Sequence, residues 1–273
     1  MKFNGSKFQL LRYGPDEDIK SDTVYFTGQM ENIIEQFSSL RDLGVIMSDS
    51  AKFEDHIDKV VKKVRQKIGW IFRTFYTRRT DILKTLWKTL VQCHIDYCSQ
   101  LYMPGQTKGM LAIEKLFYDF SSRIPECREE TYWMRLQYLS MYSQERRMER
   151  YRILYVWKII EGYAPNCGIE LGVENQRQGR KCKIPTLRPN GRKSIQTLRE
   201  QSFQINGARL FNSLPRDIRN IEICQDSFKE ALDCYLSSIP DQPKIGSLIP
   251  TATDQLTGRQ SNSILAWAAT RLS

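Results

Sequence analysis

A chain of 273 residues with 41% hydrophobic and 11% aromatic residues has enough apolar material for a globular core and is not expected to be disordered. No apolar run reaches the length of a membrane span, and the N-terminus lacks a signal-peptide pattern. We therefore expect an intracellular protein, nuclear or cytoplasmic, that is neither secreted nor bound to a membrane. The net charge of +10 favours a polyanionic partner such as nucleic acid, although a basic protein without such a partner can have the same composition.

The first 47 residues have the pattern of short strands and turns. Strands are predicted at residues 7–13, 23–26 and 39–47, and the turn sequences Gly-Pro-Asp and Thr-Gly follow the first two. Three short strands would form a small antiparallel sheet, which needs helices to cover it. Gly44, inside the third segment, fits an ordinary turn or bulge.

A long amphipathic helix is predicted over residues 53–76, after possible capping residues at 48–50. Its apolar stripe consists of Ile57, Val60, Val61, Val64, Ile68, Phe72 and Phe75. The other side is basic, and Asp58 is almost the only acid after Asp55, so partners that would neutralise this side are scarce. The candidate nucleic-acid-binding residues are Lys59, Lys62, Lys63, Arg65, Lys67, Arg73, Arg78, Arg79, Lys84 and Lys88.

The next predicted helix begins at residue 80, with Thr80 as N-cap and Asp81 in the first turn, and ends before Pro104 and Gly105. Its predicted apolar face contains Leu83, Leu86, Trp87, Leu90, His94, Tyr97, Cys98 and Leu101, whereas Lys84, Lys88 and Gln92 fall on the other side. Burial of each large apolar side chain is worth about 1.5–3 kcal/mol, so neighbouring helices must cover this face.

Two further helices are predicted at residues 108–121 and 144–161, and residues 131–139 are expected to form a short helix or a turn. Ser143 is the expected N-cap of the helix at 144–161, and Gly162 is its expected C′ residue.

The remaining chain alternates between irregular and helical patterns. Residues 173–197 are basic and aperiodic, which predicts an irregular basic loop or strand-like arm that orders on a partner. This arm is the alternative to the basic helix as the nucleic-acid-binding segment. Order is expected again at residues 201–215 and in a helix at 227–236, whose apolar face contains Phe228, Leu232, Tyr235 and Leu236. The tail after residue 240 is expected to be flexible, with a short helix at 261–267.

The cysteines do not form a disulfide or zinc pattern. They are seven in number, without a Cys-x-x-Cys pair, and only two histidines accompany them, so we expect reduced thiols. Cys93, His94 and Cys98 could suggest a metal, but at helical spacing they are expected to pack, and we predict no metal site.

Several segments resemble the thumb region and the C-terminal end of the reverse transcriptases of non-LTR retrotransposons, and the jockey-like lineage is the most similar. The segments are Leu-Trp-Lys-Thr-Leu-Val at 86–91, His-Ile-Asp-Tyr-Cys-Ser-Gln at 94–100, Leu-Tyr-Met-Pro at 101–104, Val-Trp-Lys-Ile-Ile-Glu-Gly at 156–162, Leu-Phe-Asn-Ser-Leu-Pro at 210–215, the helix at 227–236 and Ile-Pro-Asp-Gln-Pro at 239–243. They occur in the order found in that family. The resemblance further implies that Arg41, Asp42, Leu43, Gly44 and Val45 form the hairpin that grips the primer terminus.

The resemblance and the patterns together give an expected organisation. The fold is mainly α with a small N-terminal antiparallel β-sheet (α+β), and the helices form a thumb-like bundle. The expected divisions are a palm remnant with the primer-grip-like hairpin at 1–47, a helical thumb-like domain at 48–172, a basic irregular arm at 173–200, a C-terminal helical segment at 201–240 and a flexible tail at 241–273.

Polymerases of this family hold two magnesium ions with paired aspartates, whereas this chain contains no Asp-Asp pair and begins after the point where the resemblance places that motif. It also lacks a Gly-x-Ser-x-Gly, a Walker loop and a His-Glu-x-x-His, which disfavours an independent enzyme. We expect a polymerase-inactive, truncated fragment without a cofactor or small-molecule substrate. Its expected partners are the RNA and DNA backbone of a template-primer and the missing palm and fingers. The alternative is a decayed or host-retained helical protein-interaction module without nucleic-acid function.

Overall fold

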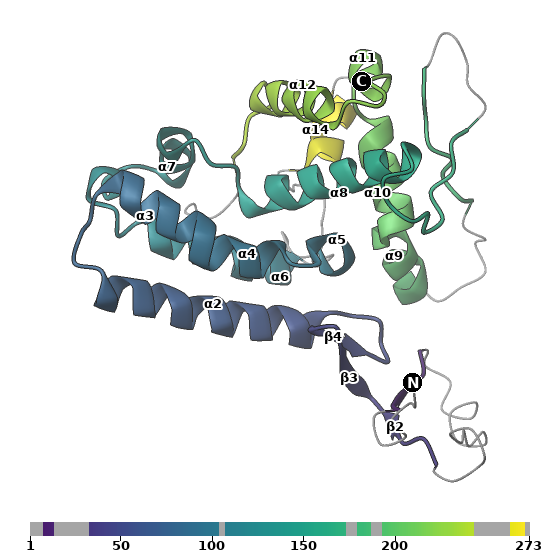
Figure 1. Ribbon diagram of the computed structural model, residues 1–273, viewed down its shortest axis with the longest axis horizontal. Coiled ribbons are helices and arrows are strands. Elements are labelled where there is room, and N and C mark those ends of the chain that lie inside the picture. Colours follow the sequence, from purple (N-terminus) through teal and green to yellow (C-terminus); the bar gives the residue numbers. More distant parts are fainter. Residues whose placement is uncertain are drawn as a thin grey trace. The chain divides into compact units, whose positions relative to one another are not determined.

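The computed structural model in Figure 1 describes residues 8–13, 33–103, 107–172, 179–186, 193–242 and 263–270. These residues are mainly α-helical with a small β part near the N-terminus, which confirms the predicted fold class. The chain forms two compact units, Met1–Lys59 (unit 1) and Val60–Ser273 (unit 2), and the long helix α2 (Glu54–Thr74) runs through the boundary between them.

Unit 1 contains two strand pairs. β3 (Ser39–Asp42) and β4 (Val45–Ser48) are antiparallel, as predicted, but β1 (Leu10–Leu11) pairs with β2 (Gln36–Phe37) in parallel. The single strand predicted at 39–47 is therefore a hairpin, because the chain reverses within it. The predicted strand at 23–26 lies outside the described residues.

The hairpin reverses at a two-residue turn. Leu43 and Gly44 both have positive φ, 44° and 92°, as a tight turn matched to the strand twist requires. Glycine adopts this conformation without strain, whereas leucine does so rarely, so the residue pattern indicated a turn at Gly44 but not that Leu43 takes part in it.

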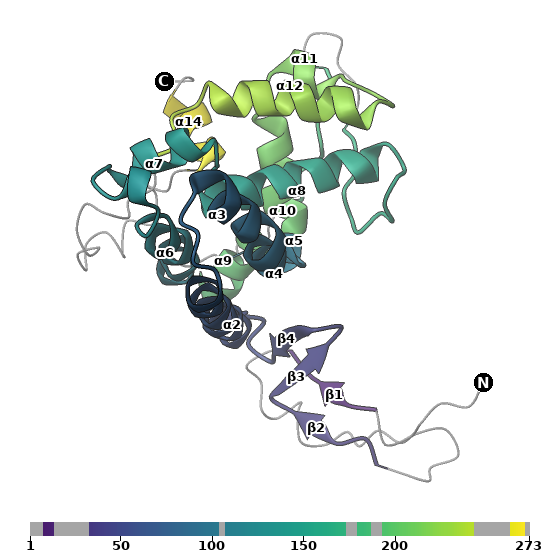
Figure 2. The ribbon, with the colours of Figure 1, turned by 60° about the vertical axis from the view of Figure 1, so that its left-hand side comes forward.

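Unit 2 is built from helices. Their bounds are α3 (Thr80–Leu86), the π-helix η3 (Trp87–Val91), α4 (Gln92–Asp96), α5 (Ser99–Tyr102), α6 (Thr107–Ser121), the 3-10 helix η4 (Pro125–Cys127), α7 (Tyr132–Leu139), α8 (Gln144–Ile160), α9 (Lys193–Gln201), α10 (Phe203–Asn212), α11 (Arg216–Arg219), α12 (Gln225–Ser237) and α14 (Ile264–Thr270). Figures 1 and 2 show α8 between α12 and α6, with α10 crossing it.

The core of unit 2 is organised around α8. Trp157 of α8 is fully buried, its ring stacks on that of Phe228 at 5.1 Å, and its indole nitrogen donates a 2.8 Å hydrogen bond to the carbonyl of Ile221. α10 approaches closely at Gly207, where an added Cβ would lie 3.0 Å from Val156. A second aromatic cluster joins Trp87 to Phe117 and Phe120 of α6, at 4.8 and 4.9 Å.

The predicted caps of α8 are confirmed. The Ser143 hydroxyl accepts a 3.2 Å hydrogen bond from the amide of Arg146. At the other end, Gly162 has φ +76°, and the amides of Gly162 and Tyr163 donate to the carbonyls of Ile159 and Lys158, which forms a Schellman motif. The predicted cap of the helix at residue 80 is wrong: Arg79 is the N-cap, and the Thr80 hydroxyl binds the Glu126 carboxylate instead.

The helix predicted from residue 80 to 103 is interrupted by the π-helix. The amide of Gln92 donates to the carbonyl of Trp87, five residues back, so one extra residue enters the turn and moves the buried face forward by one position. A left-handed residue, Cys98 with φ 56°, breaks the helix again before α5. The fully buried apolar residues are consequently Leu83, Trp87, Val91, Ile95 and Tyr102, whereas the predicted core residues Tyr97 and Leu101 are exposed.

The described parts of the predicted arm and tail belong to unit 2. Arg180 and Cys182 are buried, and the amide side chain of Asn212 binds both the backbone N–H and C=O of Cys182. Helix α9 already begins at residue 193, inside the range predicted to be irregular. α14 confirms the short C-terminal helix, shifted to 264–270, and buries Ile264 in the core around α8.

Candidate nucleic-acid interface

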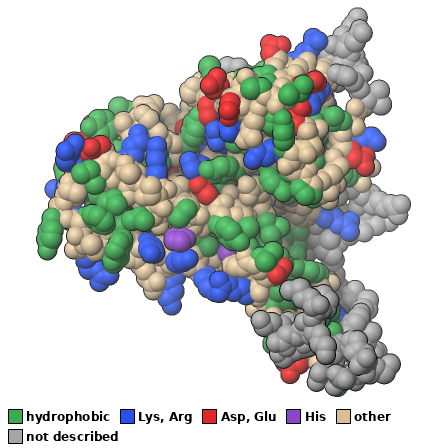
Figure 3. All heavy atoms as spheres, viewed as in Figure 1, with side chains coloured by type: hydrophobic (Ala, Val, Ile, Leu, Met, Phe, Trp, Pro, Cys, Tyr) green, Lys and Arg blue, Asp and Glu red, His purple; other side chains and the backbone are tan. Residues whose placement is uncertain are grey.

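Helix α2 presents an uncompensated basic side to solvent. Its apolar stripe is buried at Ile57, Val60, Val61, Val64, Ile68 and Ile71, which fixes the orientation of the helix. Lys59, Lys62, Lys63, Arg65 and Arg73 are exposed and Lys67 is half-buried, and none of them forms an ion pair with a described residue. We call these six residues the α2 basic face. Figure 3 shows Lys and Arg side chains gathered along this part of the molecule.

The spacing of the α2 basic face follows from helix geometry. Lys59, Lys63 and Lys67 succeed one another every four residues, which is about 6 Å along the axis. A row of ammonium groups on a rigid frame can contact successive phosphates without ordering a flexible segment.

His94 shows that the basic side continues onto α4. Partial burial lowers the pKa of His94 below 6.5, and the nearby positive charges of Lys63 and Lys67 lower it further. Partial burial and the charge of Lys88 likewise lower the pKa of Lys84. Burial is the larger cause of both shifts, and the second cause in each is a positive charge nearby, which is a condition that also favours binding of an anion.

The guanidinium groups of Arg78 and Arg79 bind carbonyl and carboxylate groups of the protein, in contrast to the residues of the α2 basic face, which form no ion pair with a described residue. The Arg78 guanidinium donates to the carbonyls of Phe72, Phe75 and Thr77 and lies 5.4 Å from the Phe72 ring, so it caps the end of α2. Arg79 forms a two-point pair with Asp81, with a shortest N–O distance of 2.8 Å. Sequence spacing could not separate these two arginines from the unpaired residues.

Trp70 is a residue of this surface that the sequence analysis missed. It is 42% exposed and lies on the solvent side of α2, and the Lys67 ammonium is 5.6 Å from the centre of its ring. The available signal was its position, three residues after Lys67 and seven after Lys63, which places it off the apolar stripe and within the basic side.

The predicted primer-grip-like hairpin has an accessible tip. Arg41 and Asp42 are exposed, Leu43 is 83% exposed, Gly44 is half-buried, and Val45 is buried. The amide of Ile46 donates to Nδ1 of His56 at 3.3 Å, which connects β4 to the first turns of α2 within unit 1.

The basic arm offers fewer available charges than its composition indicates. The Arg180 guanidinium pairs with Glu161 and lies 3.5 Å from Glu222, and Lys183 pairs with Glu170 at 3.4 Å. Arg177, Arg188 and Arg192 lie outside the described residues. Two of the positive charges of the arm, the alternative binding site, are therefore already paired with acidic side chains of the protein.

Two buried carboxyl groups serve as internal supports. Glu114 accepts hydrogen bonds from the Tyr132 hydroxyl at 2.5 Å and the Gln144 amide at 2.7 Å, and burial raises its pKa to about 7. Glu149 accepts from the Ser263 hydroxyl and from the Ile264 amide at 2.8 Å, and burial likewise raises its pKa to about 7. Each carboxyl accepts a hydrogen bond from a backbone amide at a helix N-terminus. Their burial is therefore explained by a structural role in the fold, without a catalytic one.

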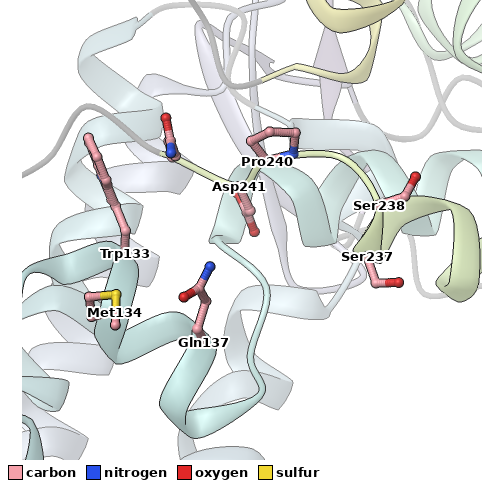
Figure 4. A pocket seen from close by; sticks show the side chains of 8 residues that line it. Trp133, Met134, Gln137, Ser237, Ser238, Pro240 and Asp241 are labelled. Atoms are coloured by element: carbon pink, nitrogen blue, oxygen red, sulfur yellow. The ribbon is translucent and has the colours of Figure 1, made fainter.

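The cavity in Figure 4, of about 370 Å³, lies between α7 and the end of α12 and has no set of catalytic side chains. Its one carboxylate, Asp241, accepts a 2.7 Å hydrogen bond from the amide of Ser143.

Within the described ranges, no group of three or more His, Cys, Asp and Glu side chains could hold a metal ion. No helix in the same ranges is long and apolar enough to cross a membrane.

Comparison of the chain with protein-family models, with curated proteins and with solved structures found no match.

Proposed function

We propose that this chain is the C-terminal, thumb-containing part of a non-LTR retrotransposon reverse transcriptase and binds the backbone of RNA and DNA through the α2 basic face. One observation carries the proposal: six Lys and Arg residues on one helix have no ion-pair partner among the described residues, while the opposite side of the helix is buried. The motifs at 86–104, 156–162 and 210–215, in family order, support the assignment to the reverse transcriptase.

Backbone binding requires positive charge at regular spacing and no base readout. The α2 basic face has positive charges at regular spacing. Burial of the apolar stripe fixes the rotation of the helix, so these charges stay directed toward solvent. The proposal assigns no catalytic residue and no metal to this chain, and we expect no extension of a primed template with magnesium or manganese. An intracellular location, in nucleus or cytoplasm, is part of the same proposal.

The test is the salt dependence of binding, measured by fluorescence anisotropy with a labelled duplex and a labelled single strand. If about four phosphates are neutralised, the logarithm of the duplex association constant should fall with log salt at a slope of roughly 3–4. The variant carrying Lys59→Gln, Lys62→Gln, Lys63→Gln and Lys67→Gln should keep its circular dichroism spectrum, because it leaves the apolar stripe intact, and should show a smaller slope and weaker binding to both probes.

A matched control removes four charges elsewhere. It carries Arg128→Gln, Lys158→Gln, Arg216→Gln and Lys229→Gln, all outside α2. The proposal requires that this control binds nearly as the parent protein does. If both variants lose affinity equally, net charge and not the α2 basic face governs binding, and the proposal is wrong.

The arm is tested by substitution, because deleting residues 176–194 would remove buried Arg180 and Cys182 from the fold. Lys181→Gln with Lys183→Gln should change the salt slope less than the α2 variant does.

The protein-interaction alternative has one observation in its favour. Helix α7 exposes Trp133, Met134 and Tyr138 at 40%, 49% and 57%. Apolar side chains exposed together on a helix are typical of a protein contact. If the chain binds neither nucleic-acid probe at 50 mM salt, this alternative replaces the first proposal.

A further inference from the structure

Trp70 is an exposed aromatic side chain that lies among the residues of the α2 basic face. We propose that α2 prefers single-stranded nucleic acid and that Trp70 is the platform on which an unpaired base stacks. This inference rests on the proposed function, because Trp70 can act in this way only if α2 binds a nucleic-acid backbone.

The position of Trp70 supports this role. A tryptophan side chain is usually buried to a large extent, whereas this one is 42% exposed on a helix whose buried stripe is already complete. It follows Lys63 by seven residues and Lys67 by three, and precedes Arg73 by three, so helix geometry places all four on the same side.

Two neighbours position the indole ring. The Lys67 ammonium is 5.6 Å from the ring centre, and the Phe75 ring lies at 5.9 Å with an interplanar angle of 88°. The aromatic surface and the cations that would contact the flanking phosphates therefore belong to one rigid helix, so neither has to be ordered when the nucleic acid binds.

The choice of single strand over duplex follows from base geometry. Inside a duplex both faces of each base are covered by the neighbouring pairs, so an indole finds no free π-face there. In a single strand the bases can separate, and each one offers a face to an aromatic side chain whatever its sequence. Lysine–phosphate contacts alone do not distinguish the two forms.

The experiment compares Trp70→Ala and Trp70→Leu with the parent chain on two probes, an oligouridine RNA and a blunt-ended duplex without unpaired bases. Trp70→Leu retains apolar contact with Phe75 but has no aromatic face, so it separates stacking from packing. Both variants should weaken binding to the single strand by about 5- to 150-fold, the range expected for one lost base–aromatic stack, and should leave duplex binding within about twofold.

Two controls make the comparison specific. Trp70→Phe should retain most of the single-strand affinity, because it keeps an aromatic face. Trp133→Ala removes a tryptophan of nearly equal exposure, 40%, from α7 and should change neither affinity.

Three results would overturn the inference. If Trp70→Ala and Trp70→Leu weaken both probes equally, Trp70 only supports the helix. If they weaken neither while the four-lysine variant weakens both, the stacking role is wrong and the proposed function stands. If the four-lysine variant itself binds like the parent protein, the proposed function fails and the inference fails with it.

Discussion

The indole nitrogen of Trp87 donates a 2.7 Å hydrogen bond to the side-chain oxygen of Gln92, and both side chains are buried. The π-turn between them makes this geometry possible, because it places residues five apart, and not four apart, along the same face. The amide nitrogen of Gln92 continues the network to Gln144 at 2.9 Å and to Asp96 at 2.8 Å. A polar residue predicted to face solvent therefore joins α4 to the start of α8.

The first prediction concerns this network. Gln92→Leu should lower the free energy of unfolding by about 1–3 kcal/mol, because it leaves the buried Trp87 indole N–H and the side-chain oxygen of Gln144 without their partner. Urea unfolding monitored by circular dichroism measures the change. Cys93→Ala, at the exposed neighbouring position, should stay within about 0.5 kcal/mol of the parent protein. Parent-like stability of Gln92→Leu would show that the network contributes nothing.

The second prediction concerns pH and Glu114. Burial raises its folded-state pKa from 4.5 to about 7, so between these values the folded protein holds a proton that the unfolded chain releases. Stability should therefore fall as pH rises through this window, by about 3 kcal/mol for this group. Glu149 should add a similar fall.

Glu114→Gln cannot ionise, so its unfolding free energy should decline less steeply between pH 4.5 and 7. Urea unfolding at half-unit pH intervals measures the slope. The double variant Glu114→Gln with Glu149→Gln should be flatter still, and an unchanged slope in Glu114→Gln would contradict the assignment.

The third prediction uses His94 as a reporter of the basic surface. Its pKa lies below 6.5 because of burial and of Lys63 and Lys67, so its contribution to stability is lost as pH falls from 6.5 through the folded-state pKa. Lys63→Gln should raise this pKa, and so should a bound oligonucleotide, whose phosphates favour the charged imidazole.

The midpoint of the His94 titration is measured by NMR, and His94→Gln assigns the signal against His56. Binding to nucleic acid should consequently strengthen as pH falls toward 6. A midpoint that a saturating oligonucleotide leaves unmoved would place the backbone contact away from His94.

The fourth prediction compares two helical glycines. Gly207→Ala should destabilise the protein by about 1–3 kcal/mol, because its Cβ would lie 3.0 Å from the buried Val156 side chain. Gly69→Ala on α2 meets no atom within 4 Å and should stabilise by about 0.5–1 kcal/mol, since alanine has the higher helix propensity. Thermal unfolding of the pair measures both signs, and equal shifts would mean that α10 and α8 are less closely packed at this point.

The sequence by itself determined the features that depend on neighbours along the chain. The buried stripe and basic side of α2, the Ser143 cap and the Gly162 terminus of α8 all follow from helical spacing and from local backbone chemistry. These features could be predicted because the groups concerned lie within a few residues of one another.

Only the tertiary structure decided the features that depend on partners distant in sequence. Gln92 is buried because Gln144 lies against it. Arg180, in the predicted basic arm, is buried and forms an ion pair with Glu161, so its charge is not available to a partner. Spacing also could not show that Arg78 caps the end of α2. Burial and ion pairing of a side chain depend on the segments that pack against it. The periodicity of a single helix does not show which distant segments these are.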